Sequence, residues 1–451
     1  MRSKLATLAF TAALVVAMAL TFSCSSNDDN GGGTSSDSGG DVSSSSGDNG
    51  GGGGSSSSVT GGGGSSSSVA TSGGSSSSVT GGGSAVSYII NGSGTTFTAT
   101  KNGATVGTAD QSIDIVIDYI RTDANGANLA IQFGNGTSVL DIGTGSVSFN
   151  NTNGTWGSIA ISGKITSNQK YGRDGVIKIG ENISINSTAD ISSTYSSTST
   201  GGGAIINNGT LTITSGTISA TGERCSAISN YDTGTLIING GTVSSTKSWA
   251  VYSGALVSGK PKNAVTINGG TISSQEDTAI SNGSGTVTIN GGRVETAASK
   301  AIENGGSNDT GTLIITGGTV SGGIDNSTNC TLNISNGTVT VTGTYRKAIS
   351  NSGTATISGG TVTATDDAIQ NSGTATISGG TVTTTGATSN AVSNFSVLNI
   401  TGGTVSAPNA TSGYAIVNDT SSGTVTITSP PAVIIGGTCN RTLSQCSSSI
   451  I

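Results

Sequence analysis

Residues 348–365 read AISNSGTATISGGTVTAT, and residues 368–385 repeat that string almost unchanged as AIQNSGTATISGGTVTTT. Inside the first copy, Ala355 and Ile357 alternate with Thr, and Val362 follows two residues after Gly360. Alternation with period two places alternate side chains on one face of a strand. The string therefore predicts short strands, with one apolar face each, that are joined by Gly turns.

The same pattern recurs along the chain from residue 201 at intervals of 20 to 29 residues. Each copy opens with Ala-Ile-x-Asn or a close variant and leads to a Gly-Gly-Thr-Val segment in most copies. Fixed periods of 20–50 residues are typical of repeat architectures, and a period near 22 made of short strands fits one coil of a β-helix. The openings lie at Ala204, Ala227, Ala250, Ala279, Ala301, Gly323, Ala348, Ala368, Ala391 and Ala415.

One coil is too small to fold alone. Its four or so buried aliphatic side chains contribute roughly 6–12 kcal/mol, whereas ordering some twenty residues costs roughly 20–40 kcal/mol. Stacking must therefore stabilise the array. The Asn of each opening suits a corner, and stacked corners predict a ladder in which each amide bonds to the next coil. Ser253 is the exception in this column, whose other members are Asn207, Asn230, Asn282, Asn304, Asn326, Asn351, Asn371, Asn394 and Asn418.

These repeats resemble the right-handed parallel β-helices of polysaccharide-active (pectate-lyase-like) and adhesin-like bacterial proteins. The chain looks most like repeat-bearing surface lipoproteins of fibre-degrading gut bacteria. The resemblance covers about residues 85–451 and implies an all-β, right-handed parallel β-helix of about 22-residue coils. We expect residues 85–200 to form an N-terminal cap and irregular coils, in which the alternating segment 112–118 is one strand. Regular coils should occupy 201–428, and a C-terminal cap should occupy 429–451.

The first 84 residues have the features of a targeting signal followed by a flexible linker. Arg2 and Lys4 precede an apolar run over residues 5–22, which is typical of a secretory signal over 1–23. Cys24 follows Ser23, as in bacterial lipoprotein signals, so the resemblance implies lipidation of that thiol and a membrane partner. The Gly/Ser-rich stretch 24–84 cannot bury enough apolar surface to fold. We expect an outer-membrane or cell-surface location, with plain secretion as the alternative.

Composition excludes several function classes. The chain has no His, so imidazole cannot serve as a base or as a metal ligand. The net charge of −7, with 17 basic residues, argues against nucleic acid as a partner. Two Trp, eight Tyr and six Phe in 451 residues make each aromatic side chain conspicuous. No cofactor is indicated.

For each of two pairs of residues, the sequence allows either a specific chemical role or an ordinary surface position. Cys439 and Cys446 lie close together in a secreted chain, which allows either a disulfide or two unlinked thiols. Glu303 and Asp325 occupy the same column of adjacent coils, so they would lie ~4.8 Å apart. Such a pair could clamp Ca²⁺, which prefers oxygen ligands, or it could be a solvated pair of surface acids.

Aromatic and basic residues gather beside the coil openings. A carbohydrate could be bound by Trp249, Tyr252, Tyr345 and Arg346. The alternative is that the loops of a solenoid tolerate sequence variation and have no binding role. The first hypothesis is a non-enzymatic, adhesin-like surface lipoprotein that binds insoluble plant polysaccharide or neighbouring cells. The alternatives are a β-helix polysaccharide lyase or hydrolase, which needs an acid–base cluster that the sequence does not show, and a passive stalk or coat. Thr-x-Thr pairs such as Thr354 and Thr356 could also form a flat hydroxyl lattice.

Overall fold

The computed structural model describes residues 84–447 except 94, 153, 169–174, 196–202, 256–262, 307–309, 344–346, 420–422, 429–431 and 441–444. These residues belong to one compact unit. The predictions on residues 1–83, which include the signal sequence, Cys24 and the linker, lie outside the described residues.

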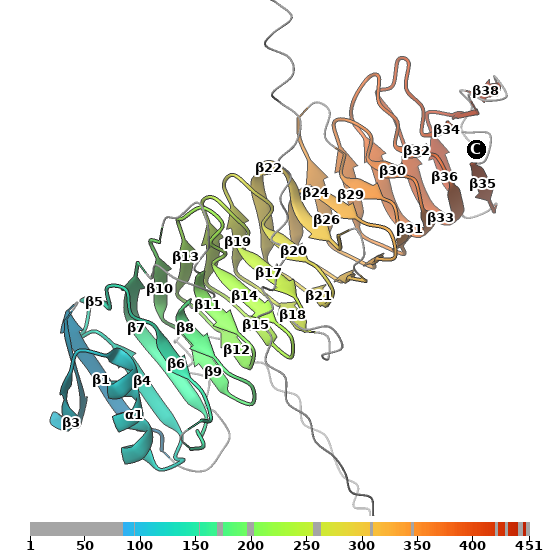
Figure 1. Ribbon diagram of the computed structural model, residues 1–451. Coiled ribbons are helices and arrows are strands. Elements are labelled where there is room, and N and C mark those ends of the chain that lie inside the picture. Colours follow the sequence, from blue (N-terminus) through green and yellow to red (C-terminus); the bar gives the residue numbers. More distant parts are fainter. Residues whose placement is uncertain are drawn as a thin grey trace, which may run out of the picture. The chain divides into compact units, whose positions relative to one another are not determined.

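The described chain is a parallel β-solenoid of about 11 turns with about 25 residues per coil. Each regular coil contributes three strands, and each strand pairs in parallel with its equivalent in the next coil. In Figure 1 the successive coils follow one another in chain order along the stack. The three columns of strands are called sheets A, B and C here, in the order in which a coil visits them. The solenoid prediction is confirmed, with coils slightly longer than expected.

Sheet A holds the Ala-Ile-x-Asn strands, and sheet B holds the strands that follow them. Sheet A consists of β6 (Val147–Phe149), β8 (Gly175–Ile179), β11 (Gly203–Asn207), β14 (Ile228–Tyr231), β17 (Val251–Gly254), β20 (Ile280–Asn282), the ends of β22 (Arg293–Asn304) and β24 (Thr319–Asn326), β27 (Ile349–Asn351), β30 (Ile369–Asn371), β32 (Val392–Asn394), β34 (Ile416–Asn418) and β37 (Thr438–Asn440). Sheet B consists of β1 (Val86–Ser93), β4 (Leu129–Phe133), the start of β7 (Ile159–Ser167), β9 (Ser184–Ser187), β12 (Thr210–Ile213), β15 (Thr235–Ile238), β18 (Ala264–Ile267), β21 (Thr286–Ile289), β23 (Thr312–Ile315), β25 (Thr331–Ile334), β28 (Thr354–Ile357), the starts of β31 (Thr374–Thr384) and β33 (Val397–Ser406), and β35 (Thr424–Ile427).

Sheet C completes each coil after the Gly corner, and a few antiparallel elements close the two ends. Sheet C consists of β5 (Val139–Asp141), the end of β7, β10 (Asp190–Ser193), β13 (Thr217–Ala220), β16 (Thr242–Ser245), β19 (Thr271–Ser274), the starts of β22 and β24, β26 (Thr338–Val341), β29 (Thr361–Ala364), the ends of β31 and β33, and β36 (Val433–Ile435). The end elements are β2 (Thr96–Lys101), β3 (Ala104–Asp110) and α1 (Ile113–Ala124) near the start, and β38 (Gln445–Ser447) near the finish.

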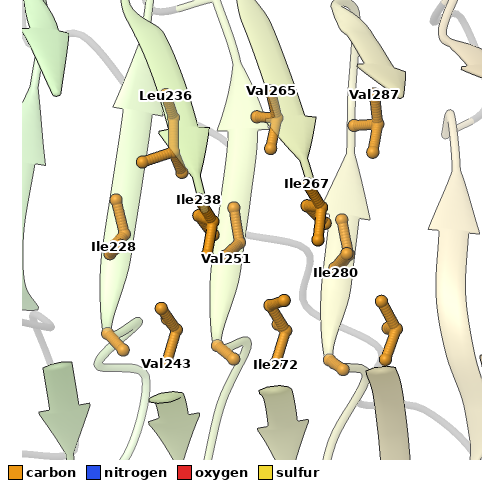
Figure 2. Packing of buried hydrophobic residues seen from close by; sticks show 14 of the residues in the cluster. Ile228, Leu236, Ile238, Val243, Val251, Val265, Ile267, Ile272, Ile280 and Val287 are labelled. Carbon is orange, nitrogen blue, oxygen red and sulfur yellow. The ribbon is translucent and has the colours of Figure 1, made fainter. Parts of the chain in front are cut away.

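The core consists of aliphatic columns inside the three sheets. In one coil, Ile228, Leu236, Ile238 and Val243 are fully buried, and Figure 2 shows them beside their equivalents in the next two coils. Since each inward residue lies on its counterpart one coil away, the columns form one continuous cluster. The alternation in the sequence therefore predicted the core correctly.

The segment 112–118 is not a strand, and that prediction was wrong. Residues 113–124 form α1, which buries Ile113, Val116, Ile117 and Ile120. These positions follow the three- and four-residue spacing of an amphipathic helix. The apparent alternation in the segment covers only its first few residues, whereas the helical spacing covers three turns.

The Asn ladder is confirmed. Asn351 Nδ2 donates to Asn371 Oδ1 at 2.7 Å, and Asn351 Oδ1 accepts from Asn326 Nδ2 at 2.7 Å. The same bond continues from Asn371 to Asn394 and from Asn394 to Asn418. All these side chains are buried, so each amide satisfies a neighbour that has no access to water.

The second corner also matches its prediction. Gly360 adopts φ +74°, and a Cβ built there would lie 2.7 Å from the carbonyl oxygen of Gly337 in the preceding coil. Only Gly accepts this backbone and this close approach without strain.

The chain end is folded back on the last coil. Strand β38 pairs antiparallel with β37, and this register places Cys439 opposite Cys446. Residues directly opposite in an antiparallel pair have Cα atoms roughly 4.5–5.5 Å apart, within the range that a disulfide spans. The disulfide itself stays a prediction.

Replacing Asn351 by Ala should lower the free energy of unfolding by about 1–3 kcal/mol, because Asn326 and Asn371 would each lose a buried partner. Ser350→Ala, one residue away on the half-buried outer side of the same strand, should change it by less than about 0.5 kcal/mol. Chemical denaturation of both variants measures the difference, and equal losses would contradict the ladder's role.

Candidate functional site

Three of the chain's few aromatic side chains form one cluster on sheet A. The rings of Trp249 and Tyr252 are nearly parallel, with centroids 5.1 Å apart and an angle of 26° between their planes. Tyr231, from the preceding coil, lies 5.6 Å from Tyr252 at a tilted angle. All three side chains are half-buried. Trp249 and Tyr252, which flank one coil opening in the sequence, are thus brought together on one face.

The backbone leaves room for this cluster at Gly254. Register pairs Tyr231 with Gly254 across adjacent strands of sheet A. A Cβ at Gly254 would lie 2.5 Å from the hydroxyl oxygen of Tyr252. Because Gly254 has no side chain, the Tyr252 ring can lie along the strand toward the corner between sheets A and B.

Tyr252 also belongs to a column of sheet A that contains the two predicted acids. Pairing along sheet A runs from Tyr252 to Ser281, from Ser281 to Glu303 and from Glu303 to Asp325. The column continues through Ser350. The aromatic cluster and the acidic pair therefore lie on the same face, two to three coils apart, which is roughly 10–14 Å.

A lysine lies between the two acids. Lys300 Nζ is 2.7 Å from Asp325 Oδ2 and 3.9 Å from Glu303 Oε1. The Asp325 side chain is 28% exposed and that of Lys300 44%. The prediction that these acids share one column is confirmed, but an ammonium group already neutralises part of their charge. The Ca²⁺ clamp stays a prediction, and this ion pair weakens the case for it.

The protonation of Lys300 limits the chemistry of the pair. Burial acts to lower the pKa of Lys300, but the hydrogen bond and charge of Asp325, with the charges of Glu303 and Asp277, outweigh it and raise the pKa above its usual value. The ammonium is therefore protonated at neutral pH. A general base needs a pKa near the working pH, so Lys300 is unsuited to abstract a proton there.

An open depression lies beside the acidic pair, at the corner between sheets A and B. It has a volume of about 260 Å³ and is lined by Glu303, Gly306, Asp325, Ser327, Thr328 and Ser352. Thr328 and Ser352 are exposed. The lining offers carboxylate oxygens and hydroxyl groups, which can accept and donate hydrogen bonds to a polar ligand.

The remaining predicted site residues fall elsewhere. Tyr345 and Arg346 lie outside the described residues, so their part in the site stays a prediction. Tyr231 and Lys300 belong to the arrangement but were not singled out as site residues. Tyr231 follows the ladder residue Asn230 directly, and this signal becomes visible only once the Asn residues are aligned.

Hydroxyl groups line the outer side of sheet C more regularly than that of sheet B. The Thr-x-Thr pattern of sheet B is interrupted at several coils. In sheet C, each described regular coil from β13 to β33 except one carries a Thr and, two residues later, a Ser or a second Thr. The exception is Arg293 and Glu295, which form an ion pair within one strand.

In the part of the chain that the structure describes, no group of three or more Cys, Asp or Glu side chains is arranged to hold a metal ion. Within the same residues, no helix has the length and apolar character needed to cross a membrane.

Comparison with protein-family models, with curated proteins and with solved structures finds no match to this chain.

Replacing Lys300 by Met should destabilise the protein at neutral pH by up to about 1 kcal/mol, because Glu303 and Asp325 would then repel each other across adjacent coils. The raised pKa of Lys300 means that its contribution is present below the ordinary lysine pKa and is lost only as pH rises through the folded value. The loss caused by Lys300→Met should shrink in acid, where the carboxylates become protonated. Lys247→Met, which removes one partner of the exposed pair with Glu276, is the control. Denaturation midpoints at pH 7 and pH 4 test this, and a loss that does not depend on pH would contradict it.

Proposed function

We propose that this protein is a non-enzymatic, lipid-anchored surface protein that binds uncharged polysaccharide through the aromatic cluster of sheet A. The observation that carries the proposal is the near-parallel pair of Trp249 and Tyr252, with Tyr231 beside it. Aromatic rings combine a large apolar face with a polar edge, which suits the faces and hydroxyl groups of sugar rings. In a chain with so few aromatic residues, three in one cluster are a marked local enrichment.

The charges around the cluster favour a neutral ligand over a uronate polymer. Lys247 is paired with Glu276, and Lys300 with Asp325. An anionic polymer would have to displace these carboxylate partners to pair with either lysine. Lys247 and Lys300 are therefore poorly suited to pair with uronates.

The Asn ladder is interrupted at Ser253, on the coil that carries Trp249 and Tyr252, and this supports a functional role for that coil. Asn282 Nδ2 continues the ladder to Asn304, but the preceding position is Ser253, and Asn263 Nδ2 bonds the carbonyl oxygen of Asn230 instead. Three buried oxygens, Ser253 Oγ, Asn263 Oδ1 and Asn282 Oδ1, have no partner in the described residues. Buried polar atoms left unpaired cost stability and often mark functional regions. Two of these oxygens lie on the coil that carries Trp249 and Tyr252, and Asn282 lies on the coil that follows it.

The acidic pair gives little support to a lyase or hydrolase. Such an enzyme needs an acid and a base near the substrate, and the described candidate for the base, Lys300, is held as an ammonium by its neighbours. The passive-stalk alternative remains distinct from binding, because it predicts no retention on any polymer.

Trp249→Ala combined with Tyr252→Ala should reduce retention on insoluble xylan or cellulose severalfold, because the stacked pair would be lost. Wild type should bind these neutral polymers better than polygalacturonate. Sedimentation with each polymer measures both effects.

Tyr414→Ala is the matched control. Tyr414 also lies directly before a coil opening and is half-buried, but it lies seven coils from Trp249. Retention of the control should equal that of wild type. Wild type that stays in solution with every polymer would favour the passive stalk, and a double variant that still binds fully would shift the site to another face.

Anchoring depends on Cys24, whose thiol would carry the lipid in this proposal. Cys24→Ser should move the protein from the detergent phase to the aqueous phase in detergent partitioning, because the acyl chains supply the membrane affinity. Ser23→Ala, which leaves the thiol in place, should partition as wild type does. Unchanged partitioning of Cys24→Ser would contradict the lipoprotein proposal.

A further inference from the structure

We propose that the corner at which the Asn ladder is interrupted binds one buried water molecule, held by Ser253, Asn263 and Asn282. The inference goes beyond the proposed function and does not depend on polysaccharide binding. Three observations carry it: buried oxygen atoms that no described residue satisfies, an exchange of residue types between two columns, and amide groups whose orientation is fixed.

The three oxygen atoms lie in the protein interior. Ser253 and Asn282 are 0% exposed, and Asn263 is 3% exposed. Ser253 Oγ, Asn263 Oδ1 and Asn282 Oδ1 have no hydrogen-bond partner among the described residues. A buried polar atom that has left bulk water without gaining a partner is costly, and native proteins pair nearly all such atoms with protein groups or with ordered water.

One coil exchanges the residue types of two columns at this corner. Ser253 pairs with Asn282 and takes the place that Asn holds in the other repeats of the ladder. Asn263 directly precedes a strand of sheet B, at a position where the two neighbouring coils carry Gly234 and Gly285. The amide that is missing from the first column is therefore present in the second.

The Asn263 side chain reaches the place of the missing ladder amide. A Cβ built at Gly311, in a regular coil, lies 2.9 Å from Nδ2 of Asn282, the ladder residue of the coil before it. A Cβ built at the equivalent Gly285 lies 1.8 Å from Asn263 Oδ1 instead. Asn263 thus presents an oxygen where the regular ladder presents a donating N–H group.

Neither amide can turn over to correct this mismatch. Asn263 Nδ2 donates to the carbonyl oxygens of Asn230 and Gly254, each at 2.9 Å. Asn282 Nδ2 donates to Asn304 Oδ1 at 2.7 Å. A rotation of either amide by half a turn would set an oxygen against these acceptors. Both Oδ1 atoms therefore remain acceptors, and they need a donor from outside the described residues.

A water molecule matches the three atoms in number and in kind. It can donate one hydrogen to each amide oxygen and accept the hydroxyl hydrogen of Ser253, and buried waters in proteins make about three such bonds. A cation is less suited to this corner, because Ser253, Asn263 and Asn282 carry no charge. An uncompensated charge among buried neutral groups costs far more than a bridging water.

The water completes the ladder by an indirect route. Asn263 bonds to Asn230 in the coil before it, and the water links Asn263 to Asn282 in the coil after it. The contact between coils that a direct amide bond makes elsewhere is thus kept through Asn263 and the water. The coil that carries Trp249 and Tyr252 is held to its neighbours in this way, and the bridge offsets part of the cost of the interruption.

The test restores the regular residue types. Ser253→Asn combined with Asn263→Gly should let the new amide donate directly to Asn282 Oδ1 and should displace the water. Magnetic relaxation dispersion of water oxygen-17 nuclei counts the long-lived waters of the folded, full-length protein, and the double variant should hold one fewer than wild type. Equal counts in the two folded proteins would overturn the proposal.

Asn263→Gly alone is the matched control. It should raise the equilibrium constant for unfolding by on the order of tenfold, because the carbonyl oxygens of Asn230 and Gly254 lose a buried donor. Adding Ser253→Asn should reverse most of that loss, since the direct ladder bond replaces the bridge. A double variant that is no more stable than the single variant in chemical denaturation would contradict the exchange of the two columns and, with it, the proposal.

A cation at the same corner is distinguished by its salt dependence. Denaturation midpoints in lithium, sodium, potassium and choline chloride, at one ionic strength, should vary no more in wild type than in the double variant. A midpoint that one of these cations raises in wild type alone would overturn the water and assign the corner to that cation.

Discussion

The backbone hydrogen bonds between equivalent residues of successive coils decide where every outward side chain of this protein lies. Each coil alone is too small to fold, so its strands are stable only when their neighbours pair in register. The buried Asn ladder reinforces that register at one corner, since each amide both donates to the next coil and accepts from the previous one, as Asn351 does. A substitution at an outward position of any column therefore places the new side chain at a fixed position on the surface.

The sequence predicts the regular part of the fold well because one physical rule governs it. Alternation identifies inward residues such as Ile228 and Val243, and the recurring Asn and Gly mark the two corners. The rule does not hold near the start of the chain. There, residues 113–118 alternate for a few positions but continue as a helix, and the spacing of Ile113, Val116, Ile117 and Ile120 decides the outcome. A short window cannot distinguish the two periods, whereas three turns can.

The candidate site was less predictable, because its residues come from different coils. Intervals between openings vary from 20 to 29 residues, so contacts across coils follow from register and not from sequence distance. Glu303 and Asp325 were aligned correctly because both lie inside the opening motif. Lys300 lies before the motif, in a segment of variable length, and its contact with Asp325 depends on the local path of β22. Tyr231 lies just after the motif, and only pairing with Gly254 shows that it faces the ring of Tyr252.

These relations explain how a scaffold of Thr, Ser and Gly can acquire a specific surface with few changes. Most outward positions carry small polar residues, so a large side chain at one of them can contact side chains of the adjacent coils. Two aromatic residues on one coil and one on the coil before it are enough to form a platform. Two acids held by one lysine lie two and three coils further along the same column of sheet A. Because backbone pairing holds these coils in register, the number of coils between them sets the distance between the platform and the acids.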